Sequence, residues 1–142
     1  MITPTIMDWN KCEREFIYSV EPDSERAKSI IAKAYQRLKR AQTTTLTEES
    51  VSFIVEDYYE VIKELLIAYL LLKGLRSKNH QCLISYFAKQ HPDLEQEAIL
   101  IAQMSFFRNR LEYYGESVPL YFYQKNKKEF EDIIVLLQNL FL

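Results

Sequence analysis

The segment 108–115 brings together side chains that can bind an anion. It reads Arg-Asn-Arg-Leu-Glu-Tyr-Tyr-Gly, so guanidinium groups and an amide lie close to two phenols. Residues four apart face each other on a helix, which pairs Arg108 with Glu112 and Arg110 with Tyr114. Two interpretations follow: a functional site for an anion, or a weak surface ion pair between Arg108 and Glu112 beside packed tyrosines. Composition alone favours the ion pair.

The two histidines, His80 and His91, limit the metal chemistry that the chain can support. A di-iron site in a helical bundle needs the Glu-x-x-His motif twice. Ser77 and Ala88 occupy the positions three residues before the histidines, so neither histidine completes this motif. The sequence therefore predicts no metal site, and nothing in it indicates a cofactor.

The two cysteines, Cys12 and Cys82, lie far apart and form no Cys-x-x-Cys motif. Cys82 and His80 are two residues apart, and such residues point in different directions on a helix, which argues against a nucleophile pair. We expect Cys82 to be a buried structural residue. We also expect both cysteines to stay reduced, as in a cytoplasm.

The N-terminus and the apolar runs bear on the location of the protein. Residues 1–5 contain no basic segment that leads into an apolar stretch, so no signal peptide is expected. The longest apolar run, 65–72, is too short for a membrane span, which needs about 20 residues. The sequence therefore predicts a cytoplasmic protein without membrane association.

Two basic segments offer further cations. Segment 73–80 holds three cationic residues and ends at His80, and segment 125–128 holds three lysines. The first is either a solvated loop whose cations complement a helix C-terminus, which is favoured, or a contact for phosphate. The second is typical of a solvated helix face. A formal net charge of −2 excludes a polybasic protein but leaves room for a local basic groove.

Helices must position all of these residues. Apolar side chains recur at helical spacing in the stretches 25–42, 51–72, 80–90, 93–115 and from 119 to the C-terminus. Residues 65–72 are apolar almost all round, which is typical of a central helix. The expected caps are Asp23 or Ser24, Thr47, the pair Asp93 and Gln96, and the C-terminal glycines Gly74 and Gly115.

The fold class follows from these stretches. Gly74 and Gly115 are the only glycines of the sequence, and it shows no strand pattern, which excludes glycine-rich phosphate loops and argues against a β-sandwich or barrel. The length of 142 residues indicates a single domain, 1–142, in which residues 1–20 form a short helical preface. We expect an all-α fold: an up-and-down antiparallel bundle of four to five helices.

Segments along nearly the whole chain resemble an archaeal type of HEPN domain. In order they are Asp8-Trp9 with Cys12, Pro22-Asp23, Ala27-Lys28, Arg37-Leu38, segment 58–65 leading to Leu71-Leu72-Lys73-Gly74, Asn79-His80, and Arg108-Asn109 followed by Tyr113-Tyr114-Gly115. The Leu-Leu-Lys-Gly turn, the Asn-His pair and the Arg-Asn-x-x-x-Tyr-Tyr-Gly segment are together the most specific of these.

The resemblance implies a fold, partners and an activity. HEPN domains are helical bundles that usually form homodimers. Many are metal-independent ribonucleases, acting as toxins or in antiviral defence, whose signature is an arginine followed a few residues later by a histidine. Many are encoded with a nucleotidyltransferase antitoxin, which in some cases attaches AMP to a tyrosine near the signature. The resemblance therefore implies a homodimer with RNA or a nucleotidyltransferase as its partner.

The signature departs from the family at one position. Arg108 matches the arginine and Asn109 the polar residue after it, but Tyr113 or Tyr114 occupies the histidine position. Arginine suits the charge of a phosphorane, whereas tyrosine, with an ordinary pKa of about 10, is a poor base at neutral pH. Arg108 and Tyr113 lie about 140° apart on a helix, so a dimer groove would build a shared site more easily. His80 supplies an imidazole only if its loop reaches that groove.

Two functions therefore stay open. One is a ribonuclease or RNA-binding, toxin-like module in which Arg108 and Asn109 contact the scissile phosphate and Tyr113, Tyr114 or His80 assists. The other is a non-catalytic dimeric module that binds a nucleotidyltransferase-type antitoxin or another partner. The missing histidine and the net charge of −2 weigh against the first function.

Overall fold

The computed structural model describes residues 4–141, and it confirms the helical prediction for this range. The elements in chain order are α1 (Trp9–Glu15), β1 (Ile17–Ser19), α2 (Ser24–Thr43), α3 (Val51–Leu72), β2 (Leu75–Ser77), α4 (Gln81–Gln90), α5 (Glu95–Tyr114) and α6 (Leu120–Asn139). α1 is the predicted preface, and it brings the described part of the chain to six helices rather than four or five. The strands were not predicted, because three residues are too few to show an alternating pattern.

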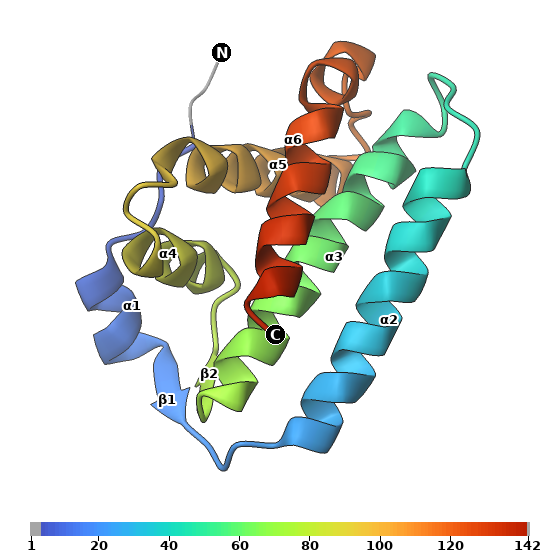
Figure 1. The fold of residues 1–142 in the computed structure, drawn as a ribbon. Helices are drawn as coiled ribbons and strands as arrows, with labels where there is room; N and C mark the ends of the chain where they lie inside the picture. The colour runs from blue at the N-terminus through green and yellow to red at the C-terminus, as the bar shows by residue number, and fades with distance from the viewer. Residues whose placement is uncertain (1–3, 142) are drawn as a thin grey trace.

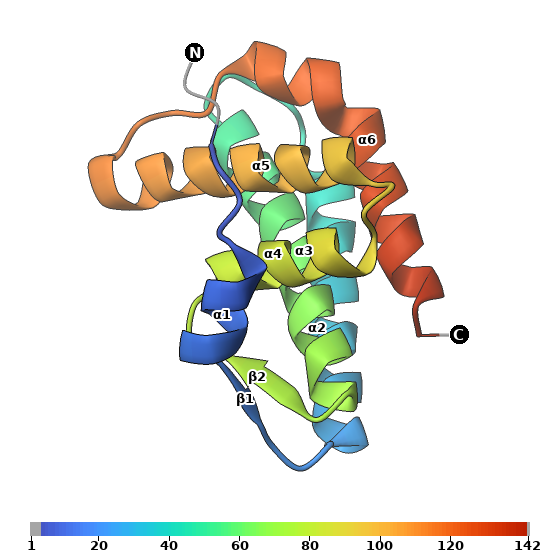
Figure 2. The ribbon, with the colours of Figure 1, turned by 90° about the vertical axis from the view of Figure 1, so that its left-hand side faces the viewer.

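Helix α3 forms the centre of the molecule (Figure 1). α2 packs along it as the antiparallel partner of a helical hairpin, and α6 lies against another side. α4 and α5 instead lie across α3, as Figure 2 shows from the side. The predicted up-and-down arrangement is therefore wrong for these two helices. With 10 residues against 22, α4 is too short to run the length of α3 and covers only part of one face.

The hydrophobic core is built around α3. Its buried apolar side chains include Val51, Ile54, Val55, Tyr58, Val61, Ile62, Leu65, Leu66 and Leu70. These side chains leave the helix in several directions, so the prediction of a central, largely apolar helix is confirmed. Each buried side chain of this size contributes roughly 1.5–3 kcal/mol relative to exposure. α3 is therefore stable only when neighbouring helices cover it on every side.

Ion pairs fix the position of α2 along α3. Arg40 donates from Nε and Nη2 to the two carboxylate oxygens of Asp57, at 2.8 and 2.6 Å. Arg37 Nε donates to Glu64 Oε1 at 2.9 Å. Asp57 is buried, and its bidentate contact with the guanidinium constrains both the orientation of the two side chains and the distance between them. These contacts set the register of the hairpin.

Several predicted helix ends are confirmed. The Asp23 carboxylate caps α2 by accepting from the backbone N–H of Arg26 at 3.0 Å. Gly115 ends α5 with a φ of 64°, in the left-handed region that favours glycine. Gly74 follows the end of α3 with a φ of 75°, and a Cβ at this position would lie 3.0 Å from the carbonyl oxygen of Val20. Glycine is therefore required at the turn into β2.

Two predicted helix starts lie later than expected. The regular helix α3 is preceded by Ser50, but Thr47 makes the hydrogen bonds of an N-cap: its hydroxyl accepts from Ser50 N at 2.9 Å and its carbonyl oxygen from Val51 N at 3.0 Å. α5 begins after Leu94, and Asp93 makes no capping hydrogen bond there. In both places, a turn formed just before the helix delays its start.

Residues 7–19, which we call the N-terminal staple, hold the segment between α3 and α4. β1 pairs with β2 in antiparallel register, and Lys78 N donates to Phe16 O at 2.9 Å. The Ser85 hydroxyl donates to the carbonyl oxygen of Met7 at 2.8 Å. The staple therefore contacts β2, the loop after it and α4.

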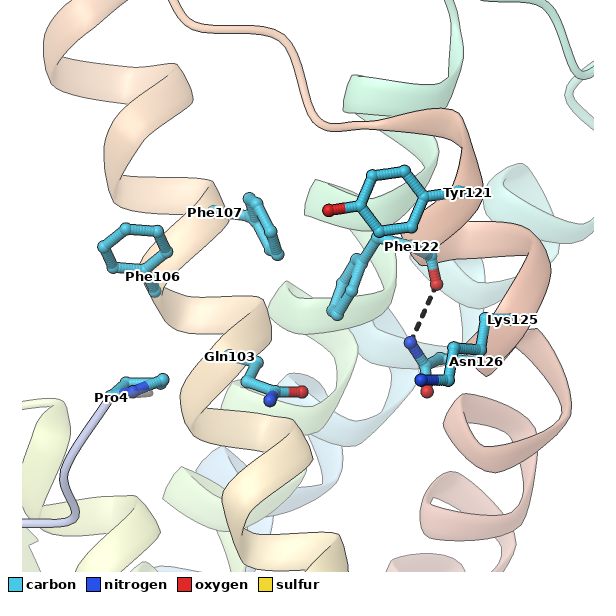
Figure 3. A pocket seen from close by; sticks show the side chains of 8 residues that line it. All are labelled: Pro4, Gln103, Phe106, Phe107, Tyr121, Phe122, Lys125 and Asn126. Atoms are coloured by element: carbon cyan, nitrogen blue, oxygen red, sulfur yellow. Dashed lines mark hydrogen bonds between the residues drawn. The ribbon is translucent and has the colours of Figure 1, made fainter. Parts of the chain in front are cut away.

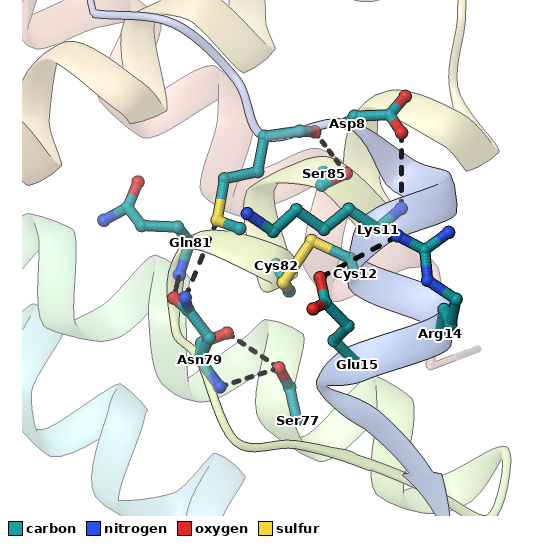
Figure 4. The surroundings of a disulfide bond; sticks show 11 residues. Asp8, Lys11, Cys12, Arg14, Glu15, Ser77, Asn79, Gln81, Cys82 and Ser85 are labelled. Carbon is teal, nitrogen blue, oxygen red and sulfur yellow. Dashed lines mark hydrogen bonds and ion pairs between the residues drawn. A yellow bond between two sulfur atoms is a disulfide. The ribbon is translucent and has the colours of Figure 1, made fainter.

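A disulfide bond between Cys12 of α1 and Cys82 of α4 completes the staple (Figure 4). Both residues are buried, and their Cα atoms lie 5.5 Å apart. The prediction that the cysteines stay reduced is wrong; only the folded chain brings α1 beside α4. Because disulfides are typical of oxidising compartments, this bond does not favour the predicted cytoplasmic location, which stays a prediction. Among residues 4–141, no helix has the length and apolar character needed to cross a membrane.

Reduction of the disulfide is expected to lower the free energy of unfolding. The bond joins residues 70 positions apart, and chain entropy assigns a loop of that length about 4 kcal/mol. Urea unfolding followed by circular dichroism, with and without dithiothreitol, measures the difference. The double variant Cys12→Ala, Cys82→Ala is the control, since dithiothreitol has no bond to reduce in it. Equal midpoints for oxidised and reduced wild type would contradict this prediction.

Candidate functional site

Arg108 lies on the face of α5 that packs against α3. Its side chain is 24% exposed, and its Nε lies 3.4 Å from Oε1 of Glu60, which is 12% exposed. Neither of these two buried atoms has a hydrogen-bond partner in the described range. A buried donor without a partner is unusual and calls for a ligand or an unmade contact. Arg108 is thus held by charge while part of its hydrogen-bonding capacity stays unused.

Glu60 also binds a second cation. Lys63, one turn further along α3 and 14% exposed, places Nζ 2.6 Å from Glu60 Oε2. One carboxylate therefore serves both Lys63 and Arg108. Two further carboxylates act on the same region: burial raises the pKa of Glu56, Arg108 opposes this shift, and the charges of Glu112 and Glu60 add to it. The group is a compact, partly enclosed set of mixed charges.

His80 joins this group from the start of α4. The side chain of Gln81, its neighbour, donates from Nε2 to Ser105 Oγ at 2.7 Å. Ser105 is buried on α5 one turn before Arg108, so this bond ties the first residue of α4 beside Arg108. The pKa of His80 is lowered from 6.5, first by partial desolvation of the ring and then by the charges of Lys63 and Arg108, with Glu60 opposing. Lys63, Glu60 and Arg108 are therefore close enough to His80 for their charges to act on its imidazole.

The loop that carries His80 is held at several points. The Ser77 hydroxyl donates to Asn79 O at 2.7 Å, and the Asn79 side chain accepts from Gln81 N at 2.8 Å. The amide of Asn79 also reaches the sulfur of Met7, at 3.6 Å (Figure 4). Together with the N-terminal staple, these bonds restrict how far His80 can move from α5.

A hollow of about 110 Å³ opens beside His80, at the end of the α2–α3 hairpin. Arg26 of α2 and Arg76 of β2 line it together with apolar side chains of α3, among them Ile67. Neither arginine forms an ion pair within residues 4–141. Glu60, Lys63 and Ile67 are three and four residues apart, so one face of α3 leads from the Arg108 group to this hollow.

The other predicted site residues lie at the exposed end of α5. Tyr113 is 71% and Tyr114 68% exposed. The guanidinium carbon of Arg110 lies over the ring of Tyr114, 4.4 Å from the ring centroid, so these two residues form the pair that their spacing predicts. Asn109 accepts a long hydrogen bond of 3.4 Å from Arg108 Nη1. Arg108 and Asn109 are thus hydrogen-bonded to each other, His80 lies on the neighbouring loop, and both tyrosines are at the surface.

The expected pair of Arg108 with Glu112 is replaced by the pair of Arg108 with Glu60. Sequence reasoning missed Glu60, Lys63 and Gln81. The run that is apolar almost all round begins only at residue 65, so nothing in the sequence marked Glu60 and Lys63 as enclosed. In the part of the chain that the structure describes, no set of three or more His, Cys, Asp or Glu side chains is placed to hold a metal ion.

The pKa of His80 is expected to lie below 6.5 and to respond to Lys63. Replacing Lys63 with Met removes a positive charge that disfavours the imidazolium, so the pKa of His80 should rise. NMR titration of the imidazole in a His91→Gln background, which leaves a single histidine signal to follow, measures it. Lys39→Met, an exposed lysine on α2, is the matched control and should leave the titration unchanged. A titration midpoint of His80 above 6.5, or one that Lys63→Met leaves unchanged, would contradict the proximity of Lys63 to the imidazole of His80.

Comparison of the chain with protein-family models, with curated proteins and with solved structures finds no match. The resemblance to HEPN domains therefore stays a prediction carried by the residues quoted for it. The homodimer, the nucleotidyltransferase partner and the RNA substrate depend on that resemblance in the same way.

Proposed function

We propose that this chain is a HEPN-like domain that binds RNA at the Arg108 group and cleaves it without a metal ion. The observation that carries the proposal is the position of His80 at the start of α4, next to Gln81, whose side chain is hydrogen-bonded to Ser105 one turn before Arg108. The family signature places its histidine a few residues after the arginine, where this chain has Tyr113 and Tyr114. An imidazole from the start of α4 takes the place of the missing one. Partial desolvation of the ring and the charge of Lys63 lower its pKa, which favours the neutral form.

Each residue type in the group suits one part of the reaction. Neutral His80 takes the proton of a ribose 2′-OH, and the 2′ oxygen forms a bond to phosphorus. Arg108 stabilises the negative charge of the phosphorane. The bond from phosphorus to the 5′ oxygen then breaks, water protonates that oxygen, and His80 returns its proton to solvent. The products are a 2′,3′-cyclic phosphate and a free 5′-OH.

The lowered pKa of His80 supports its role as a base. A general base acts in its deprotonated form, and a pKa below the working pH keeps that form populated. Activity should therefore be retained at neutral pH and be lost as the pH falls through the pKa of His80, below 6.5. Lys63 and Arg108 contribute to this behaviour by opposing the charged imidazolium.

The hollow with Arg26 and Arg76 extends the proposed site. Arg26 and Arg76 are exposed, and His80 lines the same hollow. The axis of α3 rises about 15 Å from Glu60 to Leu70. An RNA strand on this face of α3 would therefore reach both the Arg108 group and the hollow. At about 110 Å³ the hollow suits a phosphate group better than a base. This local concentration of cations offsets the overall charge of −2.

A second function is favoured by different observations. Glu60 pairs with Arg108 and the charge of Glu56 also interacts with it, which weakens the pull of Arg108 on a phosphate. Tyr113 and Tyr114 are widely exposed, and tyrosine is enriched at protein interfaces. The alternative is therefore a non-catalytic dimeric module whose α5 end binds a nucleotidyltransferase-type antitoxin or another partner.

Purified protein is expected to cleave single-stranded RNA in EDTA. Arg108→Ala should reduce the rate about 10²–10³-fold through loss of charge stabilisation. His80→Gln should reduce it about 10²–10⁴-fold through loss of the base. His91→Gln is the matched histidine control, and Tyr113→Phe with Tyr114→Phe tests the surface tyrosines; these variants should keep the wild-type rate. Gel electrophoresis of end-labelled RNA measures the rates.

The absence of cleavage by wild type would contradict the proposal and favour the partner-binding module. Cleavage that survives His80→Gln but is lost in Tyr113→Phe would contradict the role given to His80. Size-exclusion chromatography with light scattering, on the same preparations, tests the homodimer. A strict monomer at micromolar concentration would contradict the dimer in both functions.

A further inference from the structure

A second hollow, of about 260 Å³, lies between α5 and α6 (Figure 3). Its lining consists of Pro4, Gln103, Phe106, Phe107, Tyr121, Phe122, Lys125 and Asn126. Arg108 points elsewhere, about 140° around α5 from Gln103 and about 100° from Phe107. This hollow is therefore separate from the Arg108 group.

Aromatic rings form its walls. The ring centroids of Phe107 and Phe122 lie 4.5 Å apart, and those of Phe106 and Phe107 lie 5.6 Å apart. Tyr121 is 57% exposed at the opening. Aromatic faces and edges favour stacked or edge-to-face contact with another ring. An open hollow lined in this way favours a flat, apolar ligand.

Its polar groups converge from both helices. Figure 3 shows the amides of Gln103 and Asn126 on opposite sides of the hollow. Asn126 Nδ2 donates to Phe122 O at 2.9 Å, which fixes the orientation of that amide and leaves its oxygen free to accept. A few polar groups placed within an apolar lining are typical of small-molecule sites.

Lys125 differs from the other lysines of its segment. Lys128 pairs with Asp132 at 2.8 Å, and Lys127 lies 5.9 Å from the ring centroid of Tyr123. Lys125 lines the hollow instead and has no ion pair in the range that the structure describes. The expectation that all three lysines form a solvated face is therefore incomplete. One ammonium group is placed to meet an anion beside the aromatic walls.

We propose that this hollow binds a planar aromatic anion, such as an aromatic carboxylate of one or two fused rings. The volume of the hollow supports a ligand of one or two rings, because an engineered cavity of about 150 Å³ holds benzene and this hollow is larger. The ring packs against the sides of Phe107 and Phe122 that line the hollow and against Tyr121, the carboxylate meets Lys125, and the amides select for further polar groups. This site does not depend on the proposed ribonuclease activity.

2-Naphthoate is the probe, and 2-naphthamide is its neutral counterpart. Protein labelled with ¹³C in its phenylalanine and tyrosine rings is titrated with each compound by NMR. We expect saturable shifts at Phe106, Phe107, Tyr121 and Phe122 with naphthoate. Binding of the amide should be about tenfold weaker, the size of effect that losing one charge-assisted contact produces.

Three variants test the site. Lys125→Gln should weaken naphthoate about tenfold and remove its advantage over the amide. Lys127→Gln, on the same helix but outside the lining, is the matched control and should bind as wild type does. Gln103→Trp fills the hollow and should abolish binding. Circular dichroism checks its fold, and Lys125→Gln carries the test if it unfolds.

Unchanged aromatic signals at millimolar naphthoate would overturn the proposal. So would equal affinity for naphthoate and naphthamide, or equal loss in Lys125→Gln and Lys127→Gln. Naphthoate binding that disappears as protein concentration rises would show instead that a second copy of the chain covers the hollow, and this would also overturn it. Each of these results leaves the RNA-cleavage experiment unaffected.

Discussion

The burial of helix α3 is the constraint on which the rest of the structure depends. It has buried side chains in almost every direction, so no single partner can cover it. α2 covers one side of α3 and α6 covers another. The shorter α4 and the longer α5 cross the remaining face. The crossing places the start of α4 beside the middle of α5. A requirement of packing thus brings the start of α4, which follows His80, to the part of α5 just before Arg108.

The same burial explains the chemistry of that place. A charged side chain on a buried helix face must be paired, because desolvation of a lone charge is costly. Glu60 is the charged group that α5 covers, and it holds both Lys63 and Arg108. Glu60 therefore neutralises part of the charge of both cations, and its own charge also acts on His80. The N-terminal staple and its disulfide then keep the His80 loop against α5.

Local features of the fold could be predicted from the sequence, and tertiary ones could not. Helical periodicity and the cap Asp23 are properties of short segments, so most helix bounds follow within a few residues. The disulfide and the crossing of α4 and α5 exist only after distant segments meet. In the site, residue type alone pointed to Arg108 and His80. Glu60 and Lys63 escaped notice, since a pair at helical spacing is ordinary at a surface and becomes informative only once α5 buries it.

The central claim is that His80 and Arg108 serve one anion site. The most direct measurement is an NMR titration with inorganic phosphate that follows the imidazole of His80 and the Nε–H of Arg108 in the same sample. The account predicts that both signals shift with a single dissociation constant, and that Arg108→Ala abolishes the phosphate-induced shift of His80. Independent midpoints, or a His80 shift that persists without Arg108, would contradict it.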